Sequence, residues 1–95
     1  MPAYIIADVQ VTDPNAYEEY RSRVPAVIAA YGGRYLVRGG QVEPLEGDAN
    51  PQRVVVLEFP NMVQLRAFYD SPAYRPLIAI RQRSSRSSLF AIAGV

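Results

Sequence analysis

The order of strand-like and helix-like segments constrains the fold of this chain more than any other feature of its sequence. Four segments rich in β-branched or alternating apolar side chains predict β-strands. Helical segments separate the first strand from the second and the third from the fourth. The predicted strands are residues 4–11 (YIIADVQV), 34–40 (RYLVRGG), 53–59 (RVVVLEF) and 87–95 (SSLFAIAGV).

Capping residues delimit the first helix. Asp13 is a typical N-cap, and Pro14 fits the first helical position, where its missing N–H costs no hydrogen bond. Gly32 and Gly33 predict the end of this helix. Between these limits, apolar residues recur at helical spacing and form one stripe: Tyr17, Tyr20, Val24, Val27, Ile28 and Tyr31.

Two further helical segments lie between the third and fourth strands. Residues 60–70 predict a helix whose cap is Asn61, with Gln64 at the spacing of a capping box. Residues 71–83 predict a separate short helix, with Ser71 as its cap and Pro72 in its first turn. The resulting order is typical of the α+β, ferredoxin-like βαββαβ fold, in which the four strands form one antiparallel sheet. The 95 residues are enough for a single domain, residues 1–95.

Composition excludes several classes of function. The chain has no cysteine and no histidine, so thiolate sites, a histidine-ligated haem and the commonest zinc ligands are excluded. The net charge of +1 gives no reason to expect a nucleic-acid partner. No apolar run approaches the roughly 20 residues that span a membrane. We therefore expect a cytoplasmic protein that uses no metal and no prosthetic group.

Alternation along the strands sorts the apolar side chains onto two faces. One set is uniformly apolar and is expected to pack under the helices: Ile5, Ala7, Val9, Val11, Tyr35, Val37, Val55, Leu57 and Phe59. The opposite face is mixed, but it still carries a large apolar patch of Tyr4, Ile6, Leu36, Val54, Val56, Phe90 and Ile92. Because an exposed apolar patch of this size marks an interface, a homodimer closed by this face is expected.

Three charged residues fall on the mixed face of the predicted sheet. Strand parity places Asp8, Arg38 and Glu58 together there, and a hairpin centred on residue 48 brings Arg38 level with Glu58. In one interpretation the trio is catalytic, with the carboxylates moving protons and Arg38 holding an anionic substrate or an enolate. In the other, the trio is an ion-pair cluster that fixes strand register or dimer pairing.

Tyrosines on or beside the helices are candidates for a ligand pocket. Tyrosine offers an apolar ring and a hydroxyl that can orient a small aromatic ligand. The alternative is a tyrosine stripe that forms the core and keeps its hydroxyls at a wet rim. The candidate substrate-binding residues are Tyr17, Tyr20, Tyr69 and Tyr74.

Four stretches carry a resemblance to a known family. Residues 13–20 (DPNAYEEY), 29–40 (AAYGGRYLVRGG), 54–60 (VVVLEFP) and 68–77 (FYDSPAYRPL) resemble the domain of unknown function 1330 family, DUF1330. The resemblance covers nearly the whole chain and implies a dimeric α+β barrel. That superfamily also holds cofactor-independent monooxygenases, muconolactone isomerases and haem-dependent chlorite dismutases, and the last group is unlike this chain because histidine is missing.

The resemblance leaves more than one function open. A cofactor-independent isomerase or monooxygenase acting on a small aromatic or anionic substrate is the first hypothesis. A non-catalytic module that binds a small molecule, or that only dimerises, is the alternative.

Overall fold

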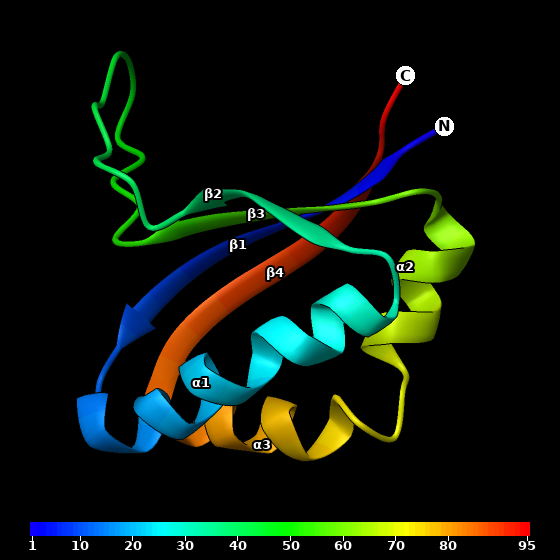
Figure 1. The fold of residues 1–95 in the computed structure, drawn as a ribbon. Coiled ribbons are helices and arrows are strands. Elements are labelled where there is room, and N and C mark those ends of the chain that lie inside the picture. Colours follow the sequence, from blue (N-terminus) through cyan, green and yellow to red (C-terminus); the bar gives the residue numbers. More distant parts are fainter.

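A four-stranded antiparallel sheet forms one layer of the molecule, and three helices cover one of its faces (Figure 1). The computed structural model describes residues 1–95. Strand order across the sheet is β2-β3-β1-β4, so β1 and β3 are central. In chain order the elements are β1 (Ala3–Val11), α1 (Pro14–Ala30), β2 (Arg34–Arg38), β3 (Val54–Phe59), α2 (Met62–Tyr69), α3 (Arg75–Ser84) and β4 (Ser85–Ala93). This is the predicted ferredoxin-like arrangement, with α3 added after α2.

Strand β1 supplies the centre of the core because alternate side chains face the helices. Ile5, Ala7 and Val9 are all buried there, as the alternation predicts. From β3, Leu57 and Phe59 join them on the same face. The helix-covered face is therefore the main core of the protein.

The predicted limits of α1 are confirmed in atomic detail. The Asp13 side chain accepts a hydrogen bond from the Ala16 amide at 3.2 Å, as an N-cap does. At the other end Gly32 has φ of +79°, a left-handed conformation that glycine adopts without strain. The Gly33 amide then donates to the Ile28 carbonyl at 2.9 Å, which ends the helix.

The start of α3 differs from the prediction. Asn61 caps α2 as expected, by accepting from the Gln64 amide at 2.8 Å. Ser71, however, caps a turn that precedes α3: its hydroxyl accepts from the Tyr74 amide at 3.1 Å and donates to the Phe68 carbonyl at 2.8 Å. The helix itself begins at Arg75, so Pro72 lies in the turn.

A stack of aromatic rings joins the sheet to the helices. The Phe68 ring lies 5.1 Å from that of Phe59 and 4.3 Å from that of Tyr74, measured between centroids. Phe59 and Phe68 are fully buried, and Tyr74 is 2% exposed. These three residues connect β3, α2 and the turn before α3.

The register between β2 and β3 corrects the sequence-based pairing of Arg38 with Glu58. Arg34 lies opposite Glu58, whereas Arg38 lies opposite Val55. A bulge between Tyr35 and Val37 inserts one extra residue into β2, and residues beyond a bulge change faces. Val37 therefore moves to the open face with Val56, and Arg38 turns toward the helices with Tyr35.

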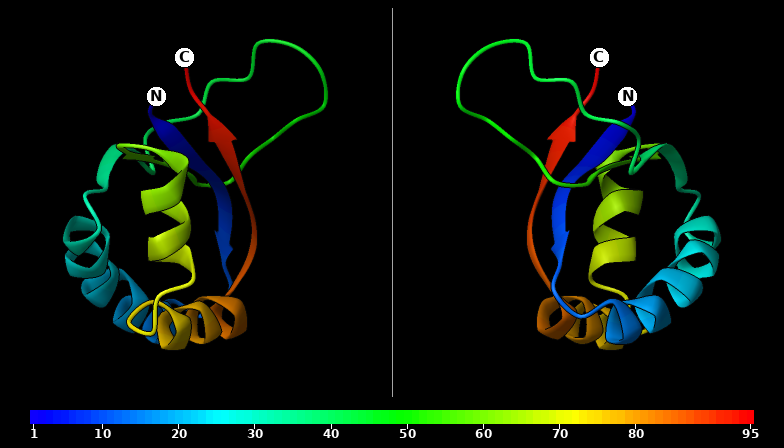
Figure 2. Two further views of the ribbon diagram at one scale, coloured as in Figure 1. Left: turned by 90° about the vertical axis from the view of Figure 1, so that its right-hand side faces the viewer. Right: turned by 90° about the vertical axis from the view of Figure 1, so that its left-hand side faces the viewer.

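The face of the sheet opposite the helices is open. Its exposed members include Phe90 at 58% and Ile92 at 51%, and Ile6 and Val56 beside them are half-buried. The connection of residues 39–53 projects beyond the body of the molecule, and the two termini lie side by side (Figure 2). None of the helices has the length and the apolar character that crossing a membrane requires.

Truncating the central ring of the aromatic stack should destabilise the fold strongly. We expect Phe68→Ala to lower the free energy of unfolding by about 3–5 kcal/mol, because the fully buried ring leaves a cavity between Phe59 and Tyr74. Val63→Ala on the same helix is the control; Val63 is 77% exposed, so its loss should cost within about 0.5 kcal/mol. Urea unfolding followed by circular dichroism measures both, and equal effects would contradict the assigned core.

Candidate functional site

A cavity of about 40 Å³ lies between α1 and the helix-facing side of the sheet. Its floor is apolar and comes from β1, where Ile5, Ala7 and Val9 point toward the helices. Of the 16 residues that line it, 12 are hydrophobic, and the remaining four are all arginines. The polar chemistry of this cavity therefore comes from arginine guanidinium groups and tyrosine hydroxyls alone.

The polar lining comes from five parts of the chain. Helix α1 supplies Tyr17, Tyr20 and Arg21, and β2 supplies Tyr35 and Arg38 at the mouth. The Arg38 guanidinium lies 4.5 Å above the Tyr35 ring, which is a cation–π contact. The other polar lining residues are Arg53 from the position just before β3, Tyr74 from the turn before α3, and Arg81 from α3.

Hydrogen bonds connect Arg81 to two of the tyrosines. Nη1 of Arg81 donates to the Tyr74 hydroxyl at 2.8 Å, and that hydroxyl is 2.8 Å from the Tyr20 hydroxyl. Arg81 is only 3% exposed, yet its Nε has no hydrogen-bond partner. A buried cation with an unused donor is unusual and calls for a functional explanation.

Backbone contacts hold Arg53 in place. The Asp8 carboxylate accepts from the Gln52 amide at 3.0 Å and from the Arg53 amide at 3.5 Å, so it fixes the start of β3. Gly39 has φ of +70°, and a Cβ there would lie 2.6 Å from the Arg53 guanidinium. Glycine therefore lets the chain leave β2 in this conformation and leaves room for Arg53, whose Nε is also buried without a partner.

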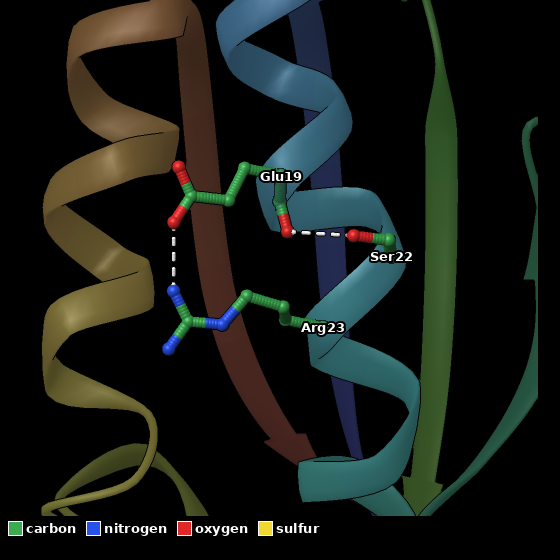
Figure 3. A network of polar contacts seen from close by, with 3 residues as sticks. All are labelled: Glu19, Ser22 and Arg23. Atoms are coloured by element: carbon green, nitrogen blue, oxygen red, sulfur yellow. Dashed lines mark hydrogen bonds and ion pairs between the residues drawn. The ribbon is translucent and has the colours of Figure 1, made fainter.

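Three of the four arginines that line the cavity have no carboxylate partner. On the outer side of α1, Arg23 pairs with Glu19 at 2.8 Å (Figure 3). At the cavity only Arg21 has such a partner, Glu18 at 3.4 Å. Arg38, Arg53 and Arg81 have none, and no carboxylate lines the cavity. The site therefore carries uncompensated positive charge.

The tyrosines of the cavity are neutral hydrogen-bond donors over the physiological range. Burial raises the pKa of Tyr20, and the hydrogen-bonded Tyr74 hydroxyl raises it further. Burial likewise raises the pKa of Tyr74, although Arg81 lowers it in part. Burial is also the largest cause of the raised pKa of Tyr17 and of Tyr35, against the lowering effect of Arg53 and Arg38 respectively.

The structure brings together only part of the site predicted from the sequence. Of the predicted catalytic trio, Arg38 lines the cavity, Asp8 binds backbone amides, and Glu58 pairs with Arg34 at 2.7 Å. The predicted assembly of these three side chains on one face is therefore wrong, because the β2 bulge moves Arg38 to the other face.

The predicted tyrosine pocket is better supported by the geometry. Tyr17, Tyr20 and Tyr74 line the cavity. Tyr69 does not; its ring lies 5.8 Å from that of Tyr74 and it lines a separate groove between α2 and β4. Sequence reasoning missed Tyr35, Arg53 and Arg81 as site residues.

Helical spacing carried a signal for Arg81. Tyr74, Leu77, Arg81 and Ser84 recur at intervals of three and four residues, and all four are buried. An arginine on the buried stripe of a helix is rarely a solvated helix end. No group of three His, Cys, Asp or Glu side chains lies close enough together to hold a metal ion.

The fold and this cavity place the chain among the ferredoxin-like α+β proteins with one helix-covered sheet face. Residues 2–95 match the family model described as domain of unknown function (DUF1330), and the chain belongs to that family. No curated protein matches it.

Solved structures share the fold at low sequence identity. RPA0582, a protein of unknown function from Rhodopseudomonas palustris, aligns with a TM-score of 0.78 and 20% identity over 99% of this chain and 82% of that one. A dimeric ferredoxin-like protein of unknown function from Thermobifida fusca gives 0.69 and 22%, over 99% and 92%. SnoaB, a cofactor-independent oxygenase from Streptomyces nogalater, gives 0.66 and 14%, over 99% and 93%.

Alkaline pH should destabilise the protein through the cavity tyrosines. In the unfolded chain they ionise near pH 10, whereas the folded protein keeps them protonated to higher pH. Above about pH 10 the unfolded state therefore binds fewer protons, and the free energy of unfolding falls as pH rises. The midpoint of urea unfolding, measured from about pH 8 to pH 11 together with tyrosinate absorbance, tests this prediction.

Tyr35→Phe is the matched control for the alkaline titration. It removes one hydroxyl whose pKa is raised and which makes no hydrogen bond to another protein group. The free energy of unfolding should therefore fall less at alkaline pH than it does in the wild type. An unchanged urea midpoint between about pH 8 and pH 11 in the wild type would contradict the assignment.

Proposed function

We propose that this protein is a homodimer that binds a small organic molecule in the cavity between α1 and the sheet. The observation that carries the proposal is the lining of the cavity. Its apolar side chains come mostly from β1 and α1, and arginines and tyrosines are the sole polar groups. Ligand sites are mostly apolar and contain a few convergent polar groups, which is the composition found here. Of the tyrosines expected from the sequence, Tyr17, Tyr20 and Tyr74 are proposed to contact the ligand.

A cofactor-independent enzyme of isomerase or monooxygenase type is the catalytic form of this proposal. Arginines such as Arg38 and Arg81, with neutral tyrosine donors, are suited to stabilising an enolate or phenolate formed from the ligand. SnoaB, described as a cofactor-independent oxygenase, shares the fold and supports this reaction class.

A non-catalytic binding module is the second candidate, and one observation favours it. No carboxylate or histidine lines the cavity, so none of its side chains is a general base with a pKa near neutrality. Oxygen uptake and product analysis with small quinols and aromatic acids separate the two candidates. Turnover that is lost in Arg38→Met would favour the enzyme, and binding without turnover would favour the module.

Filling the cavity should abolish ligand binding without unfolding the protein. A panel of small aromatic acids, their amides and quinols is tested for stabilisation, where a ligand at about 100 times its Kd contributes about 2.7 kcal/mol. We expect Ala7→Leu, on the cavity floor, to remove that stabilisation. Ala26→Leu on the exposed side of α1 is the matched control and should keep it.

Two results would count against the proposed binding function. One is a panel in which no compound stabilises the wild type. The other is stabilisation of Ala7→Leu equal to that of the wild type. Val55→Leu, a second lining variant, keeps the test decisive if Ala7→Leu does not fold.

The open sheet face is proposed as the dimer interface. It carries exposed or half-buried apolar side chains on every strand, including Leu36, Val56 and Phe90. Structures with the same fold from Thermobifida fusca and Jannaschia are described as dimeric ferredoxin-like proteins. A second copy that covers this face would leave the cavity accessible, because the cavity lies on the other side of the sheet.

A charge on the open face should dissociate the dimer. We expect the wild type to sediment at twice the mass of one chain, and Phe90→Glu to sediment as a monomer, because a carboxylate would be desolvated in the interface. Leu45→Glu in the 39–53 connection, where Leu45 is 88% exposed, should remain dimeric. A wild type that stays a folded monomer at micromolar concentration would refute the interface.

A further inference from the structure

We infer that the cavity takes an organic monocarboxylate with an aromatic body, bound with its carboxylate against Arg81 and Arg53. This inference rests on the proposed binding function, since it names the ligand class of the same cavity. It follows from the charge of the site, the free donors of the two arginines and the size of the enclosed space.

The buried charge of Arg81 has no counter-ion in the protein. Arg81 is 3% exposed, and neither it nor Arg53 has a carboxylate within ion-pair distance. The Asp8 carboxylate does not line the cavity and forms no ion pair with an arginine; its Oδ1 accepts from the amides of Gln52 and Arg53. Because a buried cation without a counter-charge is costly, an anionic ligand is the natural partner of this site.

The free donors of Arg81 indicate which kind of anion fits. Its Nη1 is used by the Tyr74 hydroxyl, while its Nε has no partner. Nε and the neighbouring Nη2 form one edge of the guanidinium, and in the proposed complex this edge faces the cavity that Arg81 lines. That edge presents two parallel N–H groups, which match the two oxygens of one carboxylate.

Arg53 provides a second donor, from a residue whose backbone is held by hydrogen bonds. Its Nε is also buried and unpartnered, and the Asp8 contact holds its backbone. Gly39 has no side chain, which leaves room for the Arg53 guanidinium beside it. Two arginines that converge on one cavity, each with an unused donor, form an anion clamp without any contribution from a metal.

The size of the cavity assigns the orientation of the ligand. The enclosed space of about 40 Å³ is smaller than the roughly 150 Å³ of a cavity that holds benzene, so it accommodates the carboxylate and not a whole ring. The mouth is formed by the half-buried Tyr35 and the exposed Arg38, stacked on each other. An aromatic body would lie there, where ring and cation contacts are available.

A matched set of three probes tests the ligand class on the intact protein. Benzoate, benzamide and phenyl phosphate share one ring and differ in the attached group, which is a carboxylate, a neutral amide and a phosphate. Binding is followed by chemical shift changes and thermal stabilisation. We expect benzoate to bind at least tenfold more tightly than benzamide, and more tightly than phenyl phosphate. Benzamide binding equal to that of benzoate would overturn the inference and leave the binding function of the cavity intact.

Variants of the arginines test the assigned contacts. Arg81→Met should lose the preference for benzoate over benzamide, while its melting temperature without ligand stays equal to the wild type or rises, because an uncompensated buried charge has been removed. Arg83→Met, exposed on the same helix, should bind benzoate as the wild type does. Arg53→Met is the second variant if Arg81→Met does not fold, and it should lose the same preference.

Three further outcomes would overturn the inference. Wild-type benzoate affinity in a folded Arg81→Met or Arg53→Met would show that the clamp is wrongly assigned. Tighter binding of phenyl phosphate would assign the site to phosphate esters instead. If no probe and no member of the wider panel binds the wild type, the proposed binding function fails as well.

Discussion

The position of one extra residue in β2 determines what the cavity between α1 and the sheet contains. Side chains alternate between the two faces of a strand, so a continuous β2 would have placed Arg38 on the open face with Arg34 and Glu58. The bulge between Tyr35 and Val37 reverses this parity, and Arg38 joins Tyr35 at the mouth of the cavity. Gly39 then leaves the strand with φ of +70° beside the Arg53 guanidinium. The positive charge at the cavity mouth depends on this local irregularity.

Arg81 is the one cation in the small core of the protein. Only 18 of 95 residues are buried, and one of them is a cation whose Nε has no partner. A hydrophobic residue there would avoid that desolvation cost. Such departures from the rules of core packing concentrate at functional positions, where they are retained for binding or chemistry. The Tyr74 hydroxyl offsets part of the free energy cost of desolvating Arg81, because it accepts a hydrogen bond from that guanidinium at 2.8 Å.

The two faces of the sheet carry different features. The helix-covered face holds the core and the cavity, with β1 contributing Ile5, Ala7 and Val9 to both. The open face keeps apolar side chains such as Ile6 and Phe90 for the proposed contact with a second copy. The proposed dimer interface and the proposed ligand cavity lie on opposite sides of one layer, so the two proposals do not require the same surface.

The sequence by itself determined the elements, the capping of α1 and α2, and the face of β1 and β3 that packs under the helices. These features depend on local chemistry: Asp13 and Asn61 cap through their own neighbours, and alternation along an uninterrupted strand assigns its faces. Tyr17, Tyr20 and Tyr74 were also identified as pocket candidates from their positions on or beside the helices.

Only the tertiary structure decided the register of β2, and with it the separation of Arg38 from Glu58. It also brought Arg53 and Arg81 together from distant parts of the chain. Register and convergence depend on pairing between segments far apart in sequence, and a single bulge, which the local pattern does not mark, changes every face beyond it.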